Sequence, residues 1–197
     1  MTDVLLATAT TIGRLTGTTP REAQLVFEAM RTPSAVKPGR AMYRGRKTDD
    51  RVDVVDALVL LGNHGIATAL TTFGQDDGAA ALAELSAAVA DPGKAVLVAL
   101  RSAAPDDRHV VVTGLDVAAG TVWLDDSTWT DADAESGRPR PAALAVPVAE
   151  FLRDWRAAGF VAIVAELTGA PAPPPVPWSR VRPRRESADA RRRDRRR

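Results

Sequence analysis

The sequence predicts an α+β domain in which N-terminal helices pack on a mainly antiparallel sheet. Two observations lead to this fold class. Apolar residues at helical spacing dominate the first part of the chain, whereas strand-type patterns gather between residues 66 and 167, with one late helix among them. The chain has 197 residues, of which 45% are hydrophobic, so it can bury a substantial core. We therefore expect residues 1–169 to form a single domain.

The first two helices are predicted from periodicity and from a start signal. Residues 3–15 carry apolar side chains at helical spacing. A second helix is expected to begin at Thr19, which can act as the N-cap, with Pro20 at the first helical position. Glu22 would then complete a capping box.

A third helix is expected after a loop at residues 32–47 that is rich in Pro, Gly, Lys and Arg. Asp49 or Asp50 can cap it, and glycines at 62 and 65 mark its end. Its predicted inward residues are Val52, Val55, Leu58, Val59 and Leu61.

The second half of the chain alternates between strand patterns and two further helices. The helices are predicted at residues 79–89 and from Pro147 to Gly159, with Phe151, Leu152 and Trp155 inward. Strands are predicted at residues 66–72, 95–100, 108–115, 121–125, 143–146 and 160–167.

The C-terminal residues differ in composition from the rest. Residues 170–178 are expected to be a Pro-rich linker, and residues 179–197 a disordered Arg-rich tail. The tail carries a net charge of +7 within an overall +1, which leaves −6 for residues 1–178. Such a tail can bind nucleic acid or another polyanion by releasing counterions. The arginines expected to do so are Arg184, Arg185, Arg191, Arg192, Arg193, Arg195, Arg196 and Arg197.

Composition also excludes several kinds of site. The chain has no cysteine, which excludes disulfides, thiolate metal ligands and a cysteine nucleophile. With only His64 and His109 it has too few histidines for a multi-histidine metal site, and no cofactor-binding motif is present, so we expect neither metal nor cofactor. We find no signal peptide or membrane-spanning segment, which predicts a cytoplasmic protein without membrane contact. The composition is typical of bacterial or phage proteins.

The predicted hairpin at residues 108–125 is the strongest functional clue. If Gly114 pairs with Thr121, His109 comes opposite Asp126. A carboxylate there could orient the imidazole as a general base, and a slip of one residue would substitute Asp125 on the opposite face. A solvated histidine at a strand edge followed by a plain turn sequence is the alternative interpretation.

The same hairpin carries a family resemblance. His109-Val-Val-Val-Thr-Gly followed by Val122-Trp-Leu-Asp-Asp126 resembles the His and Asn-Asp-Pro hairpin of C39-like peptidases, which belong to the papain-like cysteine peptidase superfamily. The order of elements over residues 50–168 follows that family. The resemblance implies a papain-like fold, His109 as the base, Asp126 as its orienting carboxylate and a peptide or protein ligand in the cleft. Asp125 stands where the family often has asparagine, and Ser127 replaces the usual proline.

The resemblance lacks its nucleophile. In the family a cysteine opens an N-terminal helix, whereas the candidate helix here opens with Thr18, Thr19 and Pro20. We therefore expect a catalytically inactive pseudo-peptidase that acts as a binding or structural module. One alternative is a hydrolase that uses a threonine or serine hydroxyl, with Thr18 or Thr19 as candidates, together with His109 and Asp126. Another is a nucleic-acid-associated virion or nucleoid protein that acts through its tail.

Overall fold

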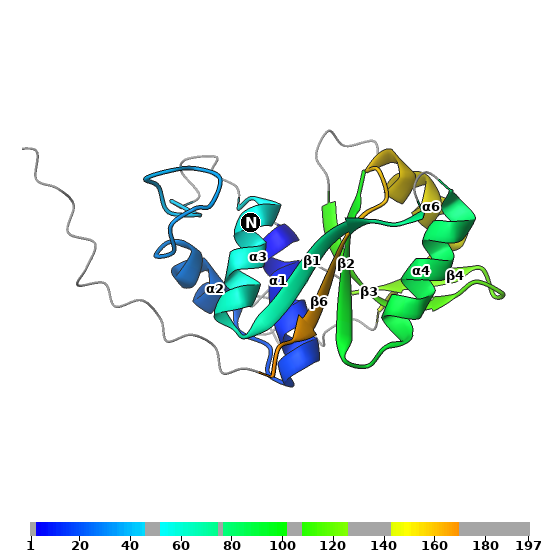
Figure 1. Ribbon diagram of the computed structural model, residues 1–197, viewed down its shortest axis with the longest axis horizontal. Coiled ribbons are helices and arrows are strands. Elements are labelled where there is room, and N and C mark those ends of the chain that lie inside the picture. The colour runs from blue at the N-terminus through cyan, green and yellow to red at the C-terminus, as the bar shows by residue number, and fades with distance from the viewer. Residues whose placement is uncertain (1–2, 46–51, 75–76, 102–107, 126–142, 170–197) are drawn as a thin grey trace, which may run out of the picture.

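A computed structural model describes residues 3–45, 52–74, 77–101, 108–125 and 143–169 (Figure 1). Within these ranges the strands form one six-stranded sheet in the order β1-β6-β2-β3-β4-β5, and all neighbouring strands are antiparallel. The strands are β1 (Ile66–Thr72), β2 (Lys94–Leu100), β3 (Arg108–Asp116), β4 (Thr121–Leu124), β5 (Leu144–Pro147) and β6 (Val161–Leu167). The predicted α+β class with a mainly antiparallel sheet is confirmed.

Helices cover both faces of this sheet. The helices are α1 (Asp3–Thr16), α2 (Glu22–Ala29), α3 (Val54–Asn63), α4 (Gly78–Ala90) and α6 (Val148–Ala157). Helices α1, α2 and α3 lie on one side of the sheet, and α4 and α6 on the other (Figure 1). All the residues of β2 from Ala95 to Leu100 are buried because both faces of this central strand are covered.

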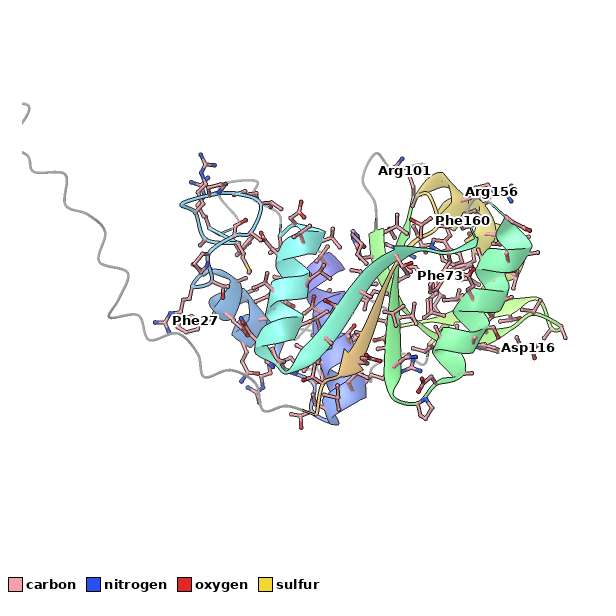
Figure 2. All side chains as sticks on the ribbon, viewed as in Figure 1. Phe27, Phe73, Arg101, Asp116, Arg156 and Phe160 are labelled. Carbon is pink, nitrogen blue, oxygen red and sulfur yellow. The ribbon has the colours of Figure 1, made fainter. Side chains whose placement is uncertain are left out.

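Two cores follow from the alternation of side chains along the strands. On β2 and β3, Val96, Val98, Val110 and Val112 face α4 and α6, where Trp155 is packed. The intervening residues Leu97 and Val111 face Ala7 of α1. Figure 2 shows Phe73 and Phe160 close together in the first core, where each meets the Trp155 ring edge to face at 6.0 and 5.2 Å between centroids.

Two helix starts differ from the predicted ones. Helix α2 is capped by Arg21 rather than Thr19, and the Gln24 side chain, not that of Glu22, accepts a 2.8 Å hydrogen bond from the N-cap backbone N–H. The reason is that Thr19 packs against Gly13 of α1. Helix α3 is capped by Asp53, which accepts from the Val55 N–H, and neither Asp49 nor Asp50 lies in the described ranges.

The inward face of α3 is also rotated from the predicted one. Its buried residues are Asp56, Ala57, Leu60 and Leu61, while Val59 is 36% exposed. The rotation follows from the Asp56 carboxylate, which accepts hydrogen bonds from the Ser34 hydroxyl at 2.8 Å and the Ala35 N–H at 2.7 Å. A buried carboxylate is tolerated when its oxygens are satisfied in this way.

The predicted register of the β3–β4 hairpin is wrong. Gly114 pairs with Trp123, not Thr121, and a bulge between Val112 and Gly114 shifts the register again, so that Val112 pairs with Leu124. The turn is tighter than predicted because the Asp116 carboxylate accepts from the Ala119 N–H at 2.8 Å. The predicted partner of His109, Asp126, lies outside the described residues, as do Ser127, the linker and the Arg-rich tail.

Candidate functional site

His109 lies near the start of β3, opposite Ala99 of β2. Because side chains alternate along a strand, His109 shares a face with Val111, and Val111 packs against Ala7 of α1. The ring is partly buried, and its Nδ1 atom is shielded from solvent. The sequence-predicted base is therefore directed to the α1 side of the sheet.

The direction of α1 across the sheet determines which end of this helix approaches His109. Ala7 packs with Val111, whereas Ile12 belongs to the cluster that contains Ala165. Ala165 pairs with Ala95, on the side of Leu97 away from the Ala99–His109 pair. Helix α1 therefore runs away from the level of His109. The first residues of α1 precede Ala7 by one helical turn, about 5.4 Å. They therefore lie at the level of His109.

A hydrogen bond fixes α1 in this orientation. The guanidinium of Arg14 donates from Nη1 to the carbonyl of Val112 at 3.2 Å. That carbonyl belongs to the residue at which the β-bulge begins, and bulges leave ladder groups without their regular strand partner. Arg14 thus ties the C-terminal half of α1 to the strand that bears His109.

The first described residues of α1 carry neither a thiol nor a hydroxyl, and Thr2, which precedes them, lies outside the described residues. The helix begins with Asp3, Val4 and Leu5. Thr18 and Thr19, the predicted hydroxyl candidates, instead follow the C-terminal end of α1. Thr19 lies there against Gly13, where an added Cβ would collide with the Thr19 side chain. The described fold therefore brings the start of α1 to the level of His109, and places both threonines beyond the opposite end of that helix.

Asp125 is the carboxylate that the described register places on the histidine face. Its backbone N–H donates to the Val111 carbonyl at 2.9 Å, in line with the Val112–Leu124 pair. Residues opposite each other share a face, so Asp125 lies on the same side as Val111 and His109, diagonally across the ladder from the histidine. Diagonal neighbours are about 7–8 Å apart, within reach of long side chains. The bulge produces this arrangement. Its extra residue moves Asp125 to the face of the sheet opposite to the one expected for a hairpin without a bulge.

A second polar cluster joins α2 to the end of α3. The Glu28 carboxylate lies 3.1 Å from Nε2 of His64 and accepts from the Asn63 amide at 2.9 Å. Burial raises the pKa of Glu28, but the hydrogen bonds from His64 and Asn63 outweigh it and bring the pKa below 4.5. His64 is the C-cap of α3. This cluster connects two helices and lies on different elements from His109.

Among the described residues, no three His, Cys, Asp or Glu side chains are grouped as a metal site would require. None of the helices in those ranges is both long and apolar enough to span a membrane.

Comparison with known proteins places the fold among C39-like peptidases. No family model matches the chain. A C39-like peptidase structure from Bacillus anthracis superimposes with a TM-score of 0.50 at 14% identity, over 82% of this chain and 86% of that one. The Streptococcus ComA peptidase domain gives a TM-score of 0.47 at 13% identity, over 83% and 90% of the two chains. At such identity the likeness establishes the fold alone, and it is the fold that the hairpin predicts.

Relatives by sequence are mycobacterial proteins without an assigned activity. The uncharacterized protein Rv1268c of Mycobacterium tuberculosis is 27% identical over 178 residues, which covers 77% of this chain and 71% of that protein. The uncharacterized protein Mb1299c of Mycobacterium bovis matches to the same extent. The domain therefore combines a C39-like fold with a sequence that has no cysteine.

Proposed function

We propose that this chain is a C39-like domain without hydrolase activity that acts as a binding module for peptide or protein segments. One observation carries the proposal. Among the described residues, the helix packed on the His109 strand begins with Asp3, Val4 and Leu5, and none of these three carries a thiol or a hydroxyl that His109 could activate. Covalent catalysis of peptide cleavage needs a nucleophile within hydrogen-bonding reach of its base.

A hydrolase that uses Thr18 or Thr19 is less well supported by the geometry. Both residues follow the C-terminal end of α1, and α1 runs away from the level of His109. A hydroxyl is also a weaker nucleophile than a thiolate and needs close contact with its base. We therefore assign the histidine end of the sheet a role in ligand contact rather than bond cleavage.

Ligand contact at this end is chemically reasonable for a peptide. The imidazole of His109 is only partly buried, and a neutral imidazole both donates and accepts hydrogen bonds, as peptide groups do. Asp125 on the same face adds an acceptor. A peptide backbone presents matching donors and acceptors along its length.

The binding proposal is tested with a phage-displayed random peptide library selected on the immobilised chain. We expect enriched peptides whose affinity falls at least tenfold in His109→Ala and is unchanged in Val117→Ala. Val117 is a suitable control because it is 53% exposed at the far turn of the β3–β4 hairpin. The absence of enrichment, or peptides that bind equally well to His109→Ala, would rule out this site.

For the tail we propose, separately, binding to nucleic acid or another polyanion. The supporting observation is ten arginines within residues 179–197. Such binding is electrostatic and weakens steeply with salt. Truncation after Gly169 should abolish salt-sensitive binding of a random DNA duplex, and retention of that binding would refute the proposal.

A further inference from the structure

Strand β1 is an outer strand of the described sheet. It spans Ile66–Thr72 and pairs with β6 on one side, and no strand in the described ranges pairs with its other edge. Its sequence, IATALTT, contains no charged residue and no proline. Outer strands commonly carry charges, prolines or bulges that prevent pairing with another chain. Since β1 has no charge or proline and keeps an unbroken register with β6, its edge is suited to strand addition.

The backbone groups at the open edge can be identified from the β1–β6 pairing. The Phe73 N–H donates to the Phe160 carbonyl at 3.1 Å, and the Thr168 N–H donates to the Gly65 carbonyl at 3.2 Å. In an antiparallel ladder, hydrogen-bonded residues alternate with residues whose backbone groups point the other way. Odd-numbered residues of β1 therefore bond to β6. The open edge presents the N–H and C=O groups of Ile66, Thr68, Leu70 and Thr72.

We propose that this edge pairs antiparallel with β1 of a second copy of the chain, about a two-fold axis through Ala69. In that register Ile66 pairs with Thr72 and Thr68 with Leu70. Each of these pairs joins residues whose backbone groups face the edge, so each exchanges two hydrogen bonds. Ala69 meets Ala69 of the second copy in a pair without hydrogen bonds. There the Cα atoms come within about 4.5 Å, which suits a methyl side chain.

Side-chain chemistry favours a second copy as the occupant. Leu70 is 52% exposed and would lie against Thr68 of the second copy on the same face of the extended sheet. The strand has no charge, so two copies do not repel each other at the axis. A single pair of strands buries less than the roughly 1,000 Å² of a stable interface. We therefore expect a weak, concentration-dependent dimer.

Sedimentation of the full chain at high salt, from low micromolar to near-millimolar concentration, tests the proposal. High salt removes association through polyanions on the tail, whereas pairing of an uncharged strand persists. We expect the dissociation constant to rise at least tenfold in Leu70→Pro. This change removes an edge N–H while leaving the β1–β6 hydrogen bonds intact. Leu70→Ala keeps that N–H and should retain dimerisation, and Val117→Ala controls for loss of an exposed apolar side chain.

A second readout does not depend on the proline variant folding. Amide exchange of the unmodified chain should slow at Thr68, Leu70 and Thr72 as concentration rises, with Ala69 and Thr71 protected throughout. Self-pairing would be overturned if the chain stays monomeric or if folded Leu70→Pro still dimerises. It would also be overturned if the exchange of the edge amides does not change with concentration. Protection that appears only when an unrelated strand-forming peptide is added would assign the edge to another partner, and would overturn it equally.

Discussion

Arg14 of α1 donates a 3.2 Å hydrogen bond to the carbonyl of Val112 on β3, at the start of the bulge in that strand. This contact links α1 to the strand that holds His109. It fixes the C-terminal half of α1 away from His109, so that the helix start lies at the level of the imidazole. The site is thus defined by helix direction as much as by the histidine itself.

Replacing Arg14 by Ala should destabilise the domain by about 1–3 kcal/mol, because a partly buried carbonyl loses a charged donor. The measurement is urea unfolding of both proteins at neutral pH. Arg153→Ala is the matched control, since Arg153 is an exposed arginine whose partner is its neighbour Asp154. A loss no larger than that of the control would show that the Arg14 contact does not hold α1 in place.

A cysteine introduced at position 3 reports the distance between the helix start and His109. Asp3→Cys should react with iodoacetamide about tenfold faster than Thr18→Cys, because a helix N-terminus favours the thiolate and a nearby imidazole can accept the thiol proton. The extra reactivity should fall when His109→Ala is added. Equal alkylation rates at the two positions would contradict the orientation of α1. So would a rate at position 3 that is unchanged when His109→Ala is added.

The placement of Thr19 can be tested through two glycines. An added Cβ at Gly13 would collide with Thr19, whereas at Gly62 of α3 it meets no atom within 4 Å. Gly62→Ala should therefore raise the free energy of unfolding by about 0.5–1 kcal/mol, and Gly13→Ala should lower it by about 1–3 kcal/mol. Thermal unfolding measures both effects. Thr19→Gly should restore much of the loss in Gly13→Ala, and the absence of any rescue would argue that Thr19 lies elsewhere.

The Glu28–His64 contact predicts a dependence of stability on pH. The pKa of Glu28 is lowered from 4.5 in the folded chain. A depressed carboxyl pKa means that the ionised form stabilises the fold above 4.5, and that this contribution is lost as the pH falls through the folded pKa. At neutral pH, Glu28→Gln should cost about 0.5–1 kcal/mol.

The measurement is the difference in melting temperature between the unmodified chain and Glu28→Gln as a function of pH. That difference should be constant above 4.5 and shrink as the pH falls further. Glu150→Gln, at an exposed carboxylate on α6, controls for the loss of one negative charge. A Glu28→Gln difference that does not change with pH would rule out ionised Glu28 as the source of the stabilisation.

The periodicity of apolar residues predicts the order of elements and β1 to the residue, because these depend on local alternation along the chain. The hairpin register depends on an extra residue that local patterns do not reveal. In the bulge, the Thr113 hydroxyl donates to the Trp123 carbonyl at 3.1 Å, and Gly114 lies close to the Trp123 ring. These contacts form across the ladder, so counting along the sequence gives the wrong register for the described part of the hairpin.

The face of α3 and the cap of α2 were missed for a related reason. Periodicity assigns Val59 to the core, but Asp56 is buried because Ser34 and Ala35 satisfy its carboxylate. Thr19 has the chemistry of an N-cap, yet it packs on Gly13 and leaves that position to Arg21. In each case a contact between distant segments outweighs a local preference, and no spacing rule contains that contact.

The most direct test of the missing nucleophile is the intact mass of the chain after exposure to a fluorophosphonate, alone and as His109→Ala. A hydroxyl activated by a histidine forms a covalent adduct with this reagent, whereas unactivated threonines and serines do not. We predict no adduct on either protein. A stoichiometric adduct on the unmodified chain that disappears in His109→Ala would show that a hydroxyl replaces the cysteine, and would contradict the central claim.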